Sequence, residues 1–294
     1  MTAEIHAVIR QFCQPALPLP TDEQPMLRPL ADVRALLLDI YGTLVTSACG
    51  DVGTSVEQGQ AEAADAALAA VGIECRCGGA QVARSLLEAI AAHHEAARQQ
   101  GVEHPEVDIV RVWGDVLTAL ADRGHVPGDA ISVDLRRLAV EYEVRTNPVW
   151  PMPHLIECLA AWRADGRRLG VVSNAQFFTP ELFPALLGQT LDELGFCRSL
   201  QFYSYRFGEA KPGSSLYRRA RAALANLNVG PDEVVYVGND MLNDVAAAAS
   251  VGFRTVLFAG DGRSLRRRRD DPRVAGVRPD VTVTDLRQLV ECLA

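Results

Sequence analysis

VRALLLDIYGTLV, residues 33–45, is the stretch that decides the fold of this chain. An almost unbroken apolar run leads to Asp39, and Gly42 turns the chain soon afterwards. A strand that is apolar on both of its faces is typical of a parallel sheet covered by helices on both sides. A carboxylate that follows such a strand is costly to bury unless it has a task. The stretch therefore predicts a buried parallel strand that ends in a functional Asp39.

Further strands of the same kind follow in the second half of the chain. Each is a short apolar segment that runs into polar residues, with helical spacing before the next one; the segments are 167–175, 233–240, 253–260 and 279–286. Strands that alternate with helices in this way indicate βαβ units. We predict an α/β fold with a Rossmann-like, mostly parallel sheet and helices on both faces.

Residues 55–146 differ in composition from the rest. They are rich in Ala, Glu, Gln and Arg and carry helical spacing over most of their length. We interpret this block as an inserted, all-helical cap. The predicted organisation has three parts: an N-terminal arm over 1–32, a Rossmann-like core over 33–50 and 148–294, and the helical cap over 51–147.

The N-terminal arm is interrupted by prolines in its second half, which excludes a long helix there. The arm can pack on the core or on a neighbouring subunit. The sequence therefore leaves the oligomeric state open, a homodimer included.

Composition limits the partners of the chain. The 294 residues carry a formal net charge of −8, which argues against binding to nucleic acid. No apolar run reaches the roughly 18 residues that a membrane span needs, and the start of the chain lacks the pattern of a secretion signal. Seven scattered cysteines, an odd number, favour reduced thiols and a cytoplasmic location. We interpret the run Arg266 to Arg269 as a solvated loop that Asp270 and Asp271 partly neutralise.

Candidate functional residues stand where the predicted strands end. Ligands of open parallel sheets bind outside the carboxyl ends of the strands. The polar residues at or near those ends are Asp39, Ser173, Asn174, Asp240 and Asp244. Lys211 precedes a Pro-Gly turn that can lead into a helix. We expect these side chains to share one pocket.

The residue types in this pocket indicate covalent catalysis on a small anionic substrate. Asp39 can attack phosphorus or carbon and form an ester. Ser173 and backbone N–H groups in the turn around Thr43 can hold phosphoryl or carboxylate oxygens, and Lys211 can neutralise developing charge. Several carboxylates without a counter-ion would repel one another, and Mg²⁺ bound by Asp39, Asp240 and Asp244 is a simple resolution.

The same residues carry a family resemblance. Asp39-Ile-Tyr-Gly-Thr-Leu44, Ser173-Asn174, Lys211-Pro212 and Gly238-Asn-Asp-Met-Leu-Asn-Asp244 resemble the four ordered motifs of the haloacid dehalogenase-like superfamily. The helical block lies between the first two motifs, where many members insert a cap. The resemblance implies that Asp39 is the nucleophile, that Thr43, Ser173 with Asn174, and Lys211 bind the transferred group, and that the fourth motif completes a metal site.

Two residues depart from the pattern of phosphatases in this superfamily. Tyr41 stands where those enzymes have the Asp that protonates the leaving alcohol, and Asn239 stands where the fourth motif usually has its first acid. The ordinary pKa of Tyr is about 10, so Tyr41 cannot repeat the role of an Asp near neutral pH. The Asp-x-Tyr-Gly-Thr motif is similar to that of 2-haloacid dehalogenases, whose halide leaves without a proton. Tyr41 is therefore a third candidate catalytic residue beside Asp39 and Lys211.

The sequence leaves three functions open. It favours Mg²⁺-dependent hydrolysis of a small phosphoester, because Asp240 and Asp244 are retained and no Arg stands about thirty residues after Asp39, where dehalogenases have one. The first alternative is a metal-independent 2-haloacid dehalogenase. The second is a catalytically silent binding module, which Tyr41 and Asn239 would suit.

Overall fold

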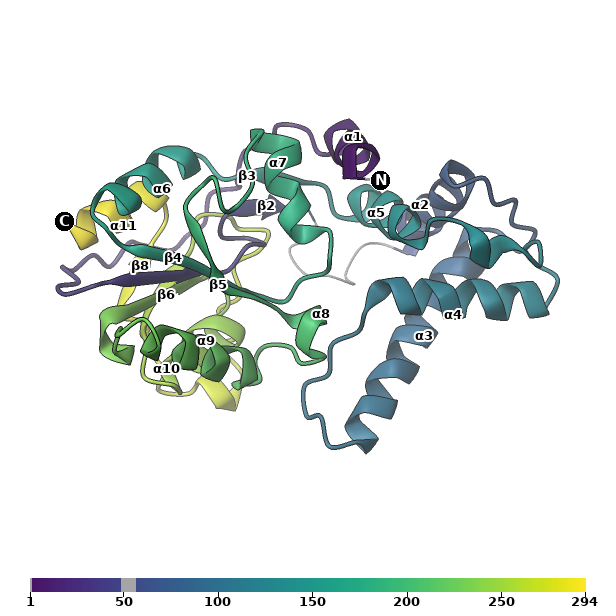
Figure 1. Ribbon diagram of the computed structural model, residues 1–294. Helices are drawn as coiled ribbons and strands as arrows, with labels where there is room; N and C mark the ends of the chain where they lie inside the picture. The colour runs from purple at the N-terminus through teal and green to yellow at the C-terminus, as the bar shows by residue number, and fades with distance from the viewer. Residues whose placement is uncertain (1, 49–56) are drawn as a thin grey trace.

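A six-stranded parallel sheet forms the centre of the larger domain (Figure 1). The computed structural model describes residues 2–48 and 57–294. The strand order is β5-β4-β1-β6-β7-β8. The strands are β1 (Ala35–Leu38), β4 (Arg168–Ser173), β5 (Phe196–Tyr203), β6 (Val234–Gly238), β7 (Arg254–Phe258) and β8 (Val281–Val283), and all neighbours pair in parallel. The predicted Rossmann-like α/β fold is confirmed.

Strand β1 is central because its side chains are apolar on both faces. Leu36 and Leu38 point into one hydrophobic core and Leu37 into the other, and all three are fully buried. Gly170 of β4 lies beside Leu37, and a Cβ there would stand 2.5 Å from the Leu37 Cδ2 atom. The unbroken apolar run seen in the sequence is therefore the consequence of burial on two sides.

Helices cover both faces of the sheet, as Figure 1 shows. Helices α6 (Leu155–Ala164), α7 (Leu182–Leu187) and α11 (Leu286–Leu293) lie on one face. Helices α9 (Ser215–Ala225) and α10 (Ala247–Ala249) lie on the other. A π-helical turn, Met241–Ala246, links β6 to α10. Such wide turns are frequent at functional sites, and this one begins directly after Asp240 of the fourth motif.

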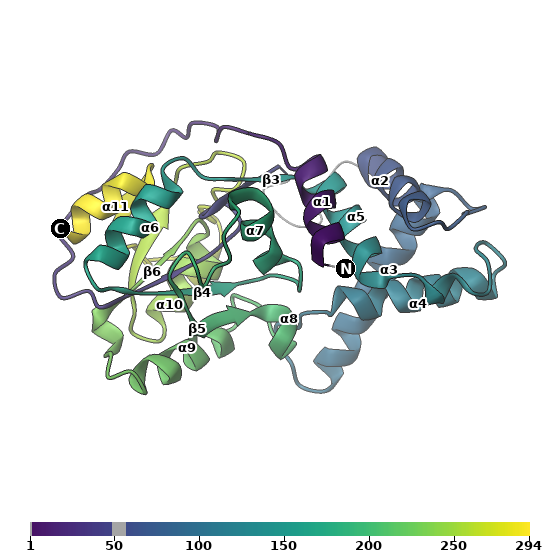
Figure 2. The same cartoon turned by 45° about the horizontal axis from the view of Figure 1, so that its top comes forward.

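Four helices form the cap at one end of the sheet (Figures 1 and 2). They are α2 (Glu57–Ala70), α3 (Gly79–Gln99), α4 (Ile109–Asp122) and α5 (Leu135–Thr146). The two chain crossings between core and cap are marked by β2 (Val45–Ser47) and β3 (Val149–Pro151), which pair antiparallel. The helical insertion is confirmed, whereas its predicted first boundary at 50/51 lies outside the described residues.

The loop between α3 and α4 docks the cap on the core. Gln176, just after β4, donates from its side chain to the Val107 carbonyl at 2.9 Å, and Glu106 accepts from the Ser204 hydroxyl at 2.7 Å. Burial raises the pKa of Glu106. The backbone of His104 accepts from Ala210, the residue before Lys211, at 2.8 Å. The cap is therefore anchored beside two of the four motifs.

The N-terminal arm packs on its own chain. Helix α1 (Thr2–Phe12) lies against α5 of the cap and α7 of the core (Figure 2). Met26 exchanges two backbone hydrogen bonds with Thr282 of β8, so the arm also runs along the edge of the sheet. Of the two placements open from the sequence, the structure has the one on the core.

Two further features bear on the expected environment of the chain. The described cysteines are free thiols, and the Sγ atoms of Cys75 and Cys77 lie 3.3 Å apart; Cys49 lies outside the described residues. Over the same described ranges, none of the helices combines the length and the apolar character needed to cross a bilayer.

The central strand should be the most sensitive part of the core. We expect Leu37→Ala to lower the free energy of unfolding by about 2–5 kcal/mol, because the cavity it leaves lies between rigid strands. Leu87→Ala on α3 is the matched control, since Leu87 is 47% exposed and its loss should cost less than about 0.5 kcal/mol. Urea titrations of both variants measure the difference, and equal losses would contradict the assignment of β1 to the centre.

Candidate active site

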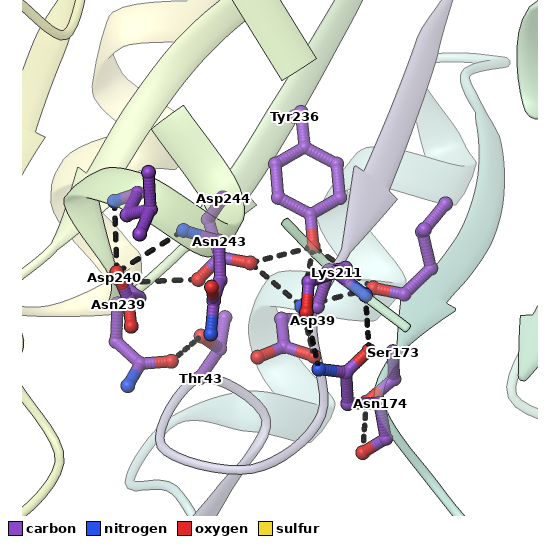
Figure 3. A network of polar contacts seen from close by, with 12 residues as sticks. Asp39, Thr43, Ser173, Asn174, Lys211, Tyr236, Asn239, Asp240, Asn243 and Asp244 are labelled. Carbon is purple, nitrogen blue, oxygen red and sulfur yellow. Dashed lines mark hydrogen bonds and ion pairs between the residues drawn. The ribbon is translucent and has the colours of Figure 1, made fainter. Parts of the chain in front are cut away.

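A small cavity opens where β1, β4 and β6 end, on the side that faces the cap. It measures about 90 Å³ and is lined by Asp39, Tyr41, Ser47, Asn174, Lys211, Asn239, Asp240, Asn243, Asp244 and Arg266. Figure 3 shows the central part of this group. Most of the predicted site residues therefore meet at one place.

The Lys211 ammonium stands at the centre of the site. It lies 2.9 Å from Asp39 Oδ1 and 2.6 Å from Asp244 Oδ1, and it donates to the Tyr236 hydroxyl at 3.1 Å (Figure 3). Its contact with Asp39 is an ion pair. Burial by itself lowers the pKa of Lys211, but the carboxylates of Asp244 and Asp39 outweigh it, so the pKa is raised. Lys211 is therefore a fixed cation between two carboxylates.

Asn174 positions this lysine through its backbone. The Asn174 side chain accepts from the Lys211 N–H at 2.7 Å and donates to the Lys211 carbonyl at 3.1 Å. Ser173 and Thr43, which were also predicted to bind the substrate, are fully buried and are not among the residues that line the cavity. Thr43 donates to Asn239 Oδ1 at 3.2 Å and so ties the nucleophile's turn to the fourth motif. Substrate binding by Thr43, Ser173 and Asn174 stays a prediction.

Asp244 is completely enclosed. Its Oδ1 accepts from Lys211 and from the Tyr236 hydroxyl, the latter at 3.1 Å, and its Oδ2 accepts from the Asp240 N–H at 2.9 Å. Burial raises the pKa of Asp244 to about 6, against the opposing effect of Lys211. Gly238 is required beside it, since a Cβ there would lie 2.3 Å from Asp244 Cγ.

Asp240 is turned toward the start of the π-helical turn and toward an arginine. Its Oδ1 accepts from the backbone N–H groups of Leu242 and Asn243 at 2.8 and 3.1 Å. Arg268 reaches the same carboxylate, with Nη2 at 2.6 Å from Oδ2. Sequence reasoning missed Arg268, because the arginine run was interpreted as a solvated loop.

Two of the three carboxylates predicted to hold Mg²⁺, those of Asp240 and Asp244, have partners within the protein. Asp244 is committed to Lys211 and Tyr236, and Asp240 to Arg268 and two backbone N–H groups. Within residues 2–48 and 57–294, no group of three or more His, Cys, Asp or Glu has the arrangement of a metal site. The repulsion between carboxylates that suggested a metal is offset by Lys211 and Arg268 instead.

Tyr41 lines the cavity as a neutral phenol. Its hydroxyl is 3.0 Å from Thr179 Oγ1, in the segment after β4. Burial raises the pKa of Tyr41, and the nearby Glu143 raises it further, so the hydroxyl keeps its proton at neutral pH. Tyr41 can therefore shape the cavity and donate a hydrogen bond, but it cannot act as a base.

Glu143 of cap helix α5 is a second acid near Tyr41 that the sequence did not reveal. Burial raises the pKa of Glu143, and Asn147 donates to its Oε1 at 3.2 Å. Asn147 in turn accepts from the Ser47 hydroxyl, which lines the cavity, at 2.8 Å. Helical spacing alone could not single out Glu143, since it stands among other charged residues of α5.

The arginine run is not a solvated loop, which corrects the sequence interpretation. Arg266, Arg267 and Arg268 are half-buried, and only Arg269 is exposed. Arg267 pairs with Asp22 and Glu23 of the N-terminal arm, and Arg266 lines the cavity. The loop therefore contributes directly to the site.

A family model described as haloacid dehalogenase-like hydrolase matches residues 33–252. The chain belongs to this family. Among solved structures with the same fold, a 2-haloacid dehalogenase from Pseudomonas syringae pv. Tomato DC3000 is 20% identical, with a TM-score of 0.56 over 88% of this chain and 97% of the other. A HAD phosphatase from Thermococcus onnurineus is 19% identical, with a TM-score of 0.52 over 88% of this chain and 97% of the other. A search of curated protein sequences finds no match.

The raised pKa of Asp244 makes stability depend on pH. Its pKa in the folded protein, about 6, exceeds the ordinary value of 3.8, so between these values the folded state binds more protons and this group makes stability fall as pH rises. We expect Asp244→Asn to remove this contribution, worth at most about 1.4 kcal/mol per pH unit. Urea midpoints from pH 4 to 7.5 measure it, with exposed Asp122→Asn as control. Parallel curves for wild type and Asp244→Asn would contradict the assignment.

Proposed function

We propose that this member of the family is a metal-independent hydrolase that displaces halide from a small 2-haloacid through an ester with Asp39. The observation that carries the proposal is the way in which the acids of the site are neutralised. Lys211 lies between Asp39 and Asp244, and Arg268 holds Asp240. These two cations balance the charge of the acids of the site.

The leaving group supports the same conclusion. An alcohol leaving from phosphorus needs a proton, and Tyr41 stands where that proton donor would be. The pKa of Tyr41 is raised by burial and its hydroxyl is engaged with Thr179. A halide leaves as a stable anion and needs no proton. Asp39 beside a neutral phenol suits such a substrate.

The proposed reaction has two steps. First, a carboxylate oxygen of Asp39 attacks C2 of the haloacid; the new C–O bond forms as the carbon–halogen bond breaks, and the halide departs with the bonding electrons. Then water attacks the Asp39 carboxyl carbon and the bond from this carbon to the substrate oxygen breaks; that oxygen takes one proton of the water and leaves as the hydroxyl of the 2-hydroxyacid. The other proton of the water passes to solvent, and Asp39 is again a carboxylate.

This proposal reverses the preference drawn from the sequence. Retention of Asp240 and Asp244 favoured a magnesium site, but the side chain of Asp240 is held by Arg268 and that of Asn239 accepts from Thr43. The solved structures with this fold include both a dehalogenase and a phosphatase. The choice between the two therefore rests on the contacts within the site.

One observation favours the second candidate, Mg²⁺-dependent hydrolysis of a phosphoester. Glu143 is a carboxylic acid whose pKa is raised by burial, near Tyr41, and it connects to the cavity through Asn147 and Ser47. An acid whose pKa is raised above its ordinary value is a candidate for the missing proton donor. In that case Asp39, which lines the cavity, is the carboxylate that would hold the metal.

Halide release separates the two candidates. We expect chloride or bromide from 2-halopropionates, unchanged by EDTA and lost by at least about 10³-fold in Asp39→Asn, because the amide cannot displace halide. A single turnover in H₂¹⁸O should leave the product unlabelled, since its new oxygen comes from Asp39. Chloride-selective electrode readings and mass spectrometry measure the two effects. The proposal fails if a panel of haloacids is inert.

The second candidate has its own signature. If phosphoesters are the substrates, Mg²⁺ should stimulate phosphate release, and Glu143→Gln should lower kcat by about 10²-fold because it removes the proton donor. Glu141→Gln on the same helix is the control, because it removes another buried acid and shows how much such a loss by itself lowers kcat. If dehalogenation is the reaction, Glu143→Gln should leave halide release within about threefold of wild type. A chain inert to both panels would contradict both enzymatic functions and leave the binding module.

A further inference from the structure

Two cysteines of the cap stand close enough to react with each other. Cys75 and Cys77 lie in the connection between α2 and α3, and their Sγ atoms share a hydrogen bond at 3.3 Å. A disulfide needs a separation of about 2.05 Å, so the two sulfurs would have to approach by roughly 1.2 Å. Rotation of the two side chains can cover a distance of this size. The sulfurs are therefore within reach of a covalent bond.

The backbone around the pair is fixed at two points. The Arg76 N–H, which lies between the two cysteines in the chain, donates to the His125 carbonyl at 2.8 Å. Gly79 begins α3 in close contact with α2, since a Cβ there would lie 1.9 Å from the Ala61 carbonyl oxygen. The short distance between the thiols is therefore a property of an anchored connection.

The pair can be reached from solvent. Both thiols are half-buried, and Cys75 lines an open hollow of about 650 Å³ at the end of α2, together with Arg76. A hollow of this size admits a small organic reagent. Three other thiols are buried and closed to such a reagent: Cys13, Cys158 and Cys292.

The two thiols differ in how readily they lose a proton to the partner. Burial, the hydrogen bond with Cys75 and the negative charge of a Cys75 thiolate raise the pKa of Cys77 to about 11. Cys77 therefore keeps its proton and donates it in a hydrogen bond when Cys75 is deprotonated. The thiolate is the attacking form of a cysteine, and Cys75 is also the thiol that lines the hollow. Cys75 is therefore the thiol that meets a reagent first.

The pair lies far from the catalytic cavity. Helix α4 begins at the loop that docks on the core and points away from the sheet, as Figures 1 and 2 show, and His125 follows its end. The hydrogen bond from Arg76 to His125 places the connection between α2 and α3 at this outer end of the cap. Neither cysteine is among the residues that line the catalytic cavity. A reaction of this pair is therefore separate from the chemistry of Asp39.

We propose that Cys75 and Cys77 form a thiol–disulfide exchange site that reacts reversibly with small-molecule disulfides. The Cys75 thiolate attacks one sulfur of the small disulfide, a new S–S bond forms, and the other half leaves as a thiolate that takes up a proton. Cys77 then loses its proton to solvent and attacks the Cys75 sulfur, which closes the Cys75–Cys77 bond and releases the second half, again as a thiol.

The balance of this reaction is two electrons. The cysteine pair is oxidised to a disulfide, and the small disulfide is reduced to two thiols. Accessible disulfides are the labile ones, so a reducing thiol reopens the bond by the same steps in reverse. The inference does not rest on the proposed function, because Asp39 takes no part in it.

Mass spectrometry of the whole chain tests the proposal. The chain is fully reduced, freed of reductant and treated with 2-hydroxyethyl disulfide, which is a small neutral probe. We expect Cys75 and Cys77 to be linked within one peptide that is lighter by two hydrogen atoms, and dithiothreitol should restore both thiols. Protein that keeps both thiols in excess probe, or that carries the probe on both cysteines without linking them, overturns the proposal.

Single substitutions test the order of the two steps. Cys77→Ser should stop at a mixed disulfide between Cys75 and half of the probe, because the second thiol is missing. Cys75→Ser should react at position 77 at least about tenfold more slowly than wild type reacts at Cys75, since Cys77 does not line the hollow. Cys197→Ser, which removes a half-buried thiol elsewhere, is the control and should form the Cys75–Cys77 bond within about twofold of the wild-type rate.

Two further outcomes would also count against the site. A bond from Cys75 to a second chain in place of Cys77, or equal reaction rates in Cys75→Ser and Cys77→Ser, overturns the proposed exchange. Circular dichroism checks that each variant is folded, and the measurement on the wild type needs no variant. Formation of the Cys75–Cys77 bond in a chain that releases no halide would contradict the proposed function alone.

Discussion

The rest of the site depends on one ammonium group shared by two carboxylates. Lys211 is buried between Asp39, which follows β1, and Asp244, which lies in the π-helical turn after β6. The side chain of Asn174, just after β4, holds the Lys211 backbone through two hydrogen bonds. An unpaired charge at this depth would be far more costly than any hydrogen bond gained, so the three side chains exist as a unit. The geometry of the nucleophile is therefore set by a group that stands more than 170 residues away in the chain, which the parallel sheet brings beside it.

The acids around Lys211 are also paired, first Asp244 and then Asp240. Asp244 also accepts from Tyr236 and from the backbone of Asp240, and the carboxylate of Asp240 is in turn held by Arg268. Each acid has a partner of opposite charge or a set of N–H donors, which is what buried polar groups require. Neutralisation by protein cations, rather than by a divalent ion, leads to the dehalogenase-type chemistry that we propose.

The residues around the cavity include several that lie outside the four family motifs. Glu143 and Ser47 stand where cap and core join, and the arm strap of residues 17–23 secures the loop that carries Arg266. These elements surround a cavity of about 90 Å³, which is small. The surroundings of the cavity are thereby built by the core, the cap and the arm together.

The sequence by itself determined the fold and the centre of the site. Apolar strands that end in polar residues predicted most of the sheet, and strand-end position was enough to bring Asp39, Asn174 and Asp244 to one edge. Lys211 follows no predicted strand and was assigned to the site from its Lys-Pro turn and the order of the motifs. Only the tertiary structure decided where the carboxylate of Asp240 points and that Arg266, Arg267 and Arg268 are part of the site rather than of a solvated loop. The physical reason is the range of the interactions. Strand and helix patterns arise from neighbours two to four residues apart, whereas Arg267 meets Asp22 across 245 residues, a pairing that no local spacing encodes.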